Sequence, residues 1–178
     1  MDNSRKMTGP ERQVFILDQL KKAETPISGR ELANMTNVSR QIIVQDVSLL
    51  KAKKEPIIAT SQGYVYMMEK KTDGMKQRTI VCRHKPEETL EELQAIVDCG
   101  AYVYDVRVEH PVYGDLTGIL NITNRQEAEK FVRSLKMTNA SLLLELTDGL
   151  HLHTIAATTE DKLDAACEEL KTRGFIFE

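Results

Sequence analysis

All four histidines of this 178-residue chain lie between residues 84 and 153, and two of them are separated by a single residue. His151 and His153 fall at positions i and i+2 of an expected strand, so their side chains project to the same face. Two imidazoles on one face, with Cα atoms about 6–7 Å apart, can share one metal ion. His84 ends another expected strand and can supply a third imidazole.

The helix expected after His84 carries several carboxylates, Glu87, Glu88, Glu91 and Glu92. Glu88 and Glu92 are four residues apart and share one helical face, so either can add an oxygen ligand. Imidazoles with one carboxylate suit zinc, nickel or iron better than magnesium or calcium. The alternative interpretation involves no metal: the two histidines would lie on a partly exposed polar face of the strand, and the glutamates would lie on a solvated face of the helix.

Motifs of nucleophilic or phosphate chemistry are absent from the sequence. There is no Gly-x-Ser-x-Gly and no phosphate-binding glycine loop, which favours sensing over catalysis. The three cysteines, Cys82, Cys99 and Cys167, are widely spaced and form no Cys-x-x-Cys pair. We expect them to be small buried hydrophobes in a reducing compartment.

The net charge of −3 argues against a uniformly basic, nucleic-acid-binding surface, but the charge is unevenly divided. Residues 1–70 contain 11 Lys and Arg against 8 Asp and Glu, whereas residues 71–178 contain 13 against 19. This division predicts two domains with different partners, 8–69 and 75–178, joined by a polar linker at 70–74. No apolar run approaches the roughly 18 residues of a membrane span, and no signal peptide is evident, so we expect a cytoplasmic protein.

The first seventy residues predict three helices followed by a small hairpin. Capping boxes, Thr8 with Glu11 and Ser28 with Glu31, mark the first two helix starts. The expected helices cover about 9–22, 30–35 and 40–51, and the expected strands cover 56–60 and 64–67, with a turn at Gly63. This order is typical of a winged helix-turn-helix.

A winged helix-turn-helix inserts its third helix into the major groove of DNA. Glutamine can pair with adenine there, and arginine can pair with guanine or phosphate. The alternatives are a winged domain that binds protein, or side chains that are simply solvated. The predicted DNA contacts are Ser39, Arg40, Gln41, Gln45 and Lys51.

Beyond the linker the pattern predicts the order β-α-β-β-α-β-β-α-β, an α+β fold. The segment Thr147-Asp148-Gly149 is typical of a hairpin turn between two strands. The expected strands cover 79–82, 101–108, 115–123, 141–146, 150–156 and 175–177, and the expected helices cover 86–97, 125–136 and 159–173.

The chain resembles the NiaR (YrxA-type) niacin-responsive repressors over about residues 12–177. Residues 28–33 and 38–50 carry the resemblance in the first half, in a pattern common to many regulators. The more specific match is His84, the segment His110-Pro-Val-Tyr-Gly114 and the segment Leu150-His-Leu-His153.

The resemblance implies a dimeric, non-enzymatic repressor of NAD biosynthesis or niacin-uptake genes, with nicotinic acid as co-repressor. It also implies one divalent metal per chain, nickel, zinc or iron, held by His84, Glu92, His151 and His153. Glu88 remains the alternative carboxylate, and we expect His110 and Tyr113 near the effector pocket. Two other hypotheses stay open: a metal-dependent enzyme acting on a pyridine metabolite, and a regulator whose effector is the metal itself.

Overall fold

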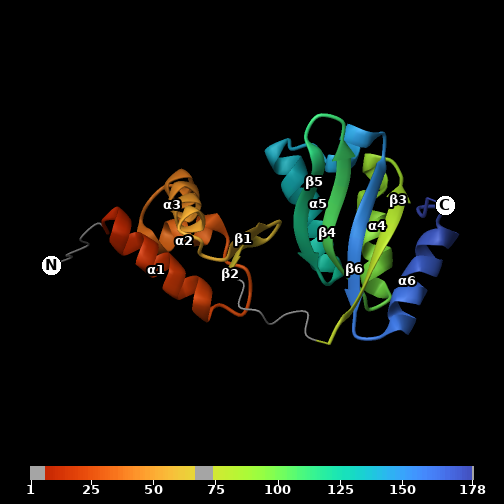
Figure 1. The fold of residues 1–178 in the computed structure, drawn as a ribbon, viewed down its shortest axis with the longest axis horizontal. Coiled ribbons are helices and arrows are strands. Elements are labelled where there is room, and N and C mark those ends of the chain that lie inside the picture. Colours follow the sequence, from red (N-terminus) through yellow and green to blue (C-terminus); the bar gives the residue numbers. More distant parts are fainter. Residues whose placement is uncertain (1–6, 67–73, 178) are drawn as a thin grey trace. The chain divides into compact units, whose positions relative to one another are not determined.

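A computed structural model describes residues 7–66 and 74–177 (Figure 1). The chain divides into two compact units, Met1–Lys71 and Thr72–Glu178. The predicted strand end at Met67 and the predicted linker residues 70–73 lie outside the described residues. Within the described parts, no helix has the length and hydropathy needed to cross a membrane.

The first unit contains three helices and a two-stranded antiparallel hairpin, as predicted. The elements are α1 (Gly9–Lys22), α2 (Gly29–Thr36), α3 (Arg40–Ala52), β1 (Ile57–Thr60) and β2 (Gly63–Tyr66). Both predicted capping boxes form, at Thr8 and at Ser28. The apolar stripes of the three helices meet in one core, formed by Ile16, Leu20, Leu32, Ala33, Ile43, Val47, Leu50 and Ile57.

Glycine at position 63 fixes the hairpin against the chain that precedes α2. Gly63 has φ +145°, and a Cβ atom there would lie 2.5 Å from the carbonyl oxygen of Ile27. Ile27 and Tyr64 exchange two backbone hydrogen bonds, of 3.0 and 2.8 Å. The close approach therefore requires glycine, and it attaches the hairpin to the helical core.

A buried ion pair sets the position of α3 against α1. The carboxylate of Asp46 in α3 accepts hydrogen bonds from Arg12 Nε at 2.5 Å and from Gln13 Nε2 at 3.2 Å. Gln13 Oε1 in turn accepts from Lys53 Nζ at 2.9 Å. Because Asp46 is only 3% exposed, its charge depends on these partners.

The second unit is built on a four-stranded antiparallel sheet of order β3-β6-β4-β5. Helix α4 packs against both α5 and α6. All three helices contribute to one core with the sheet, which confirms the α+β class (Figure 1). The elements are β3 (Lys76–Arg83), α4 (Thr89–Asp98), β4 (Tyr102–His110), β5 (Gly114–Ile122), α5 (Arg125–Thr138), β6 (Leu150–Ala157) and α6 (Glu160–Thr172).

The predicted strand 141–146 is wrong, and with it the hairpin at Thr147-Asp148-Gly149. The chain instead forms a 3-10 helix, η2 (Leu143–Thr147), which buries Leu144. Its first turn is closed locally, because the Glu145 carboxylate accepts the backbone N–H of Leu142 at 2.8 Å. Asp148 then adopts a left-handed conformation with φ 51°, and Gly149 follows with φ +84°, so these residues end a helix rather than connect two strands.

Two other predicted elements differ in extent. The segment 175–177 forms one bridge, between Cys82 and Ile176, instead of a full strand. The predicted helix 86–97 begins as a 3-10 turn, η1 (Pro86–Glu88), because the Glu88 carboxylate accepts the backbone N–H of Lys85 at 2.8 Å.

Replacing Asp46 with alanine should destabilise the first unit by roughly 1–3 kcal/mol, because the part-buried guanidinium of Arg12 and the buried amide of Gln13 lose their shared acceptor. The measurement is hydrogen exchange on peptides from α1 and α3 in the full-length protein. The matched control is Asp18→Ala, which breaks the exposed Lys22–Asp18 pair and should cost about 1 kcal/mol or less. Equal protection in the two variants would contradict a structural role for the buried pair.

Candidate metal centre and DNA-binding helix

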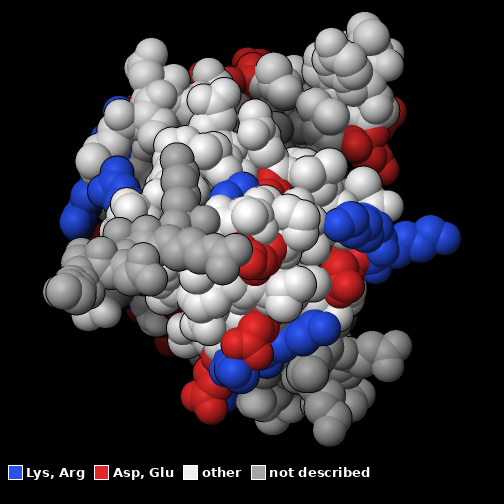
Figure 2. Space-filling model, turned by 90° about the vertical axis from the view of Figure 1, so that its left-hand side faces the viewer, with Lys and Arg blue, Asp and Glu red and all other residues white. Residues whose placement is uncertain are grey.

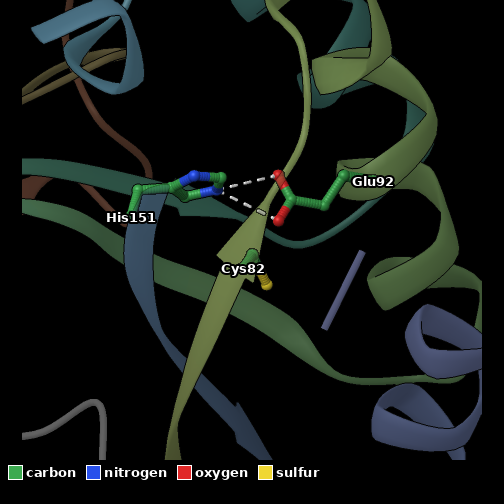
Figure 3. A group of neighbouring side chains, drawn as sticks. All are labelled: Cys82, Glu92 and His151. Carbon is green, nitrogen blue, oxygen red and sulfur yellow. Dashed lines mark hydrogen bonds and ion pairs between the residues drawn. The ribbon is translucent and has the colours of Figure 1, made fainter. Parts of the chain in front are cut away.

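The structure brings three histidines and one glutamate together inside the second unit. His84 follows β3, His151 and His153 lie in β6, and Glu92 lies in α4. Glu92 Oε2 is 2.7 Å from His84 Nε2 and 3.3 Å from His153 Nε2, and Oε1 is 3.2 Å from His151 Nε2. Figure 3 shows the carboxylate of Glu92 pointing at the imidazole of His151.

The surrounding backbone dictates this convergence. The i and i+2 positions of β6 direct both imidazoles toward the helix-covered face, as the spacing predicts. At Gly149 a Cβ atom would lie 2.4 Å from the carbonyl oxygen of His84, and φ is +84°. Glycine therefore lets the chain carrying His84 lie directly against the start of β6.

Each imidazole is oriented by a hydrogen bond from its other ring nitrogen. Because a carbonyl only accepts, each Nδ1 donates its proton to that carbonyl, and each Nε2 is left facing Glu92. Such outer hydrogen bonds are typical of metal-binding histidines. The acceptors are the carbonyls of Lys85 for His84 at 2.8 Å, Gly149 for His151 at 2.8 Å and Asp105 for His153 at 2.6 Å.

The electrostatics of the cluster favour a charged carboxylate among imidazoles. Burial alone would raise the pKa of Glu92, but the charge of His153 and hydrogen bonds from all three histidines hold that pKa well below its ordinary value. Burial likewise lowers the pKa values of His84 and His153, yet interactions with Glu92 outweigh it and raise both. The cluster therefore stabilises positive charge beside Glu92, and protons and a metal ion compete for the same lone pairs.

The donor set fits a divalent transition metal. Imidazole nitrogens and one carboxylate are ligands that zinc, nickel and iron accept, and all four groups are at least nine-tenths buried. The Glu92 carboxylate lies among the three imidazoles, whereas the carboxylate of the alternative, Glu88, caps the η1 turn.

Cys82 lies against this cluster, and its position there was not predicted from the sequence. It is fully buried, as expected, but it stands opposite His151 in the register of β3 and β6. One ligand atom each from Cys82, Glu92 and His151 lie within 4.8 Å of one another. Burial and the charge of Glu92 raise the pKa of the thiol.

His110 and Tyr113 form a separate feature in the turn between β4 and β5. His110 Nδ1 accepts the backbone N–H groups of Val112 and Tyr113, both at 3.2 Å. The two rings contact each other with centroids 4.9 Å apart, and Tyr113 is 75% exposed. These contacts order the turn and leave the Tyr113 ring accessible from solvent.

The first unit presents the predicted DNA contacts on the surface of α3. Ser39, Arg40, Gln41, Gln45 and Lys51 are all exposed. Ser39 also caps the helix, because its hydroxyl accepts the N–H of Ile42 at 3.4 Å. Val44, which the sequence analysis did not single out, is 40% exposed between Gln41 and Gln45 and could meet a thymine methyl group. The exposure of Val44 could have been predicted from the sequence, because Val44 falls outside the i, i+4, i+7 pattern of the buried residues Ile43, Val47 and Leu50.

One face of the molecule, shown in Figure 2, carries mixed charge rather than a uniformly basic surface. On the face shown in Figure 2, Lys and Arg stand in separate groups among Asp and Glu, and large areas carry neither. On this face the described residues form no uniformly basic surface that would attract DNA.

The fold defines a helix-turn-helix regulator whose second domain contains a buried cluster of histidines and one glutamate. Comparison with family models matches residues 12–65 to the HTH domain and residues 77–178 to the 3H domain. The chain is 50% identical over 177 residues to the transcription repressor NadR of Bacillus subtilis (strain 168), covering 99% of this chain and 98% of that protein. It is 41% identical over 168 residues, 94% of each chain, to the probable transcription repressor NiaR of Thermotoga maritima.

The chain therefore belongs to the family of NadR and NiaR transcription repressors, with an HTH domain followed by a 3H domain. It is a DNA-binding transcriptional repressor and not an enzyme.

Proposed function

We propose that this repressor is metal-dependent and responds to nicotinic acid, and that it controls genes of NAD biosynthesis or niacin uptake in the cytoplasm. The carrying observation is the convergence of three imidazole Nε2 atoms and the Glu92 carboxylate in a buried site. The response to nicotinic acid follows from the resemblance of His84, residues 110–114 and residues 150–153 to niacin-responsive repressors.

His84, Glu92, His151 and His153 would hold one divalent ion, of nickel, zinc or iron. When bound, the ion supplies a Lewis-acidic position that a carboxylate or a pyridine nitrogen can occupy. The protein's own contribution is orientation: each Nδ1–H bond to a carbonyl keeps Nε2 aimed at one point. We assign His110 and Tyr113 to effector contact, with the accessible Tyr113 ring available to an aromatic ligand.

The response to an effector requires unequal binding to two states of the repressor. Nicotinate acts as co-repressor only if it binds the DNA-competent state more tightly, and each tenfold preference is worth about 1.4 kcal/mol. We propose a homodimer, because a helix-turn-helix pair reads two half-sites about 34–36 Å apart. Residues 8–69 would read the operator, and residues 75–178 would sense the effector and form the dimer.

The second candidate is a regulator whose effector is the metal itself. It is favoured by burial, since His84 is 7% exposed and His151, His153 and Glu92 are 3% exposed or less. Such a cluster admits an ion more readily than an aromatic acid. Titrating metal and nicotinate separately into an operator-binding assay distinguishes the two candidates.

Replacing Arg40 with alanine should weaken operator binding by roughly 1–3 kcal/mol if the side chain pairs with a base. Fluorescence anisotropy on operator DNA measures the affinity, and metal content should stay unchanged. The control Lys22→Ala removes the same charge from α1 and should have a smaller effect. Unchanged affinity in the Arg40 variant, or equal losses in both variants, would exclude Arg40 from base recognition.

Replacing both His151 and His153 with alanine should abolish metal uptake, because two of the four donors are lost. Elemental analysis of the purified protein gives the metal content per chain, and circular dichroism checks the fold. The control His110→Ala should keep its metal. Full occupancy in the double variant would eliminate this cluster as the metal site.

A further inference from the structure

Cys82 occupies a position from which its sulfur can reach a metal held by the histidines. In the register of β3 and β6 it faces His151 directly, so the two side chains project to the same side of the sheet. Ligand atoms of Cys82, Glu92 and His151 lie within 4.8 Å of one another, and all three residues are buried. They come from three different elements, β3, α4 and β6 (Figure 3).

The three ligand atoms lie close enough together to share one ion. Zinc binds histidine nitrogen at about 2.0–2.1 Å and thiolate sulfur at about 2.3 Å, so a nitrogen and a sulfur on opposite sides of one ion stand about 4.4 Å apart. The ligand atoms of Cys82, Glu92 and His151 all lie within 4.8 Å of one another, a range that includes this separation. The side chains of Cys82 and His151 can therefore both bind one ion.

The other two cysteines lie in different surroundings. Cys167 lies in α6 and is contacted by Arg78 Nη1 at 3.5 Å, while Cys99 follows the end of α4. Both are half-buried, and neither belongs to the cluster around Glu92. They are matched controls for any experiment on the thiol of Cys82.

We propose that Cys82 is a fifth protein ligand of the metal centre, joining His84, Glu92, His151 and His153. This proposal rests on the proposed metal centre and adds a sulfur donor to it. On binding, the S–H bond breaks, the proton passes to solvent and the sulfur lone pair forms the bond to the ion. The step is not a redox reaction.

A sulfur donor changes which metals the centre prefers. Thiolate is a soft ligand that favours ions such as zinc over manganese or magnesium, which prefer oxygen donors. Five protein donors also leave a single position on a six-coordinate ion, which limits the effector to one coordinating atom. The competing interpretation is that the thiol only donates a hydrogen bond to Glu92 and orients it.

Cobalt(II) separates these two roles, because a thiolate ligand gives an intense sulfur-to-cobalt charge-transfer band in the near ultraviolet. One equivalent of cobalt(II) is added to the metal-free full-length protein and the absorption spectrum is recorded. We expect the band in the unaltered protein, in Cys99→Ser and in Cys167→Ser. We expect Cys82→Ser to lose the band. We also expect it to bind cobalt about 10–100-fold more weakly or worse, because losing a residue that only hydrogen-bonds to a metal ligand already costs that much affinity.

One cobalt bound per chain without the band would overturn the sulfur ligand and leave the histidine and glutamate site intact. A band that persists in Cys82→Ser would also overturn it, since the sulfur must then come from another cysteine. Failure of the unaltered protein to bind cobalt would contradict the metal centre itself, and the sulfur ligand with it. If Cys82→Ser does not fold, the spectrum of the unaltered protein still decides.

Discussion

The second unit depends on the confinement of one carboxylate and three imidazoles in a space from which water is largely excluded. Glu92 is fully buried, so its negative charge must be balanced by its neighbours. The balance requires β3, β6 and α4 to stand in one arrangement, with Gly149 allowing His84 to approach β6. The buried cluster therefore restricts how β3, β6 and α4 can pack, and the packing of these elements in turn positions the four side chains.

Local signals made the first unit predictable from the sequence. The capping boxes at Thr8 and Ser28 involve residues three apart, so they operate before any tertiary contact forms. The pairing of His151 and His153 was equally accessible, because strand periodicity alone puts them on one face. The structure of segment 141–146 was not predictable in this way, since its consecutive leucines suit either a strand or a 3-10 helix. The segment forms a 3-10 helix in which Leu144 is buried, and this burial depends on tertiary contacts.

The composition of the site needed tertiary information. Helical periodicity puts Glu88 and Glu92 on one face, and only the 3-10 turn at 86–88, which uses Glu88 as its cap, separates their roles. The place of Cys82 depends on the register between β3 and β6, two strands nearly seventy residues apart in the chain. Nothing local to Cys82 distinguishes it from a small core residue.

The central claim is that nicotinate, acting through the metal-loaded centre in one unit, raises the affinity of the other unit for DNA. The most direct test measures the affinity of metal-loaded, full-length protein for DNA upstream of NAD biosynthesis and niacin-uptake genes while nicotinate is titrated, with metal-free protein in parallel. We expect nicotinate to tighten binding by the metal-loaded protein about tenfold or more, equivalent to about 1.4 kcal/mol, and to leave the metal-free protein unchanged. Equal affinity of the metal-loaded protein with and without nicotinate would contradict the claim.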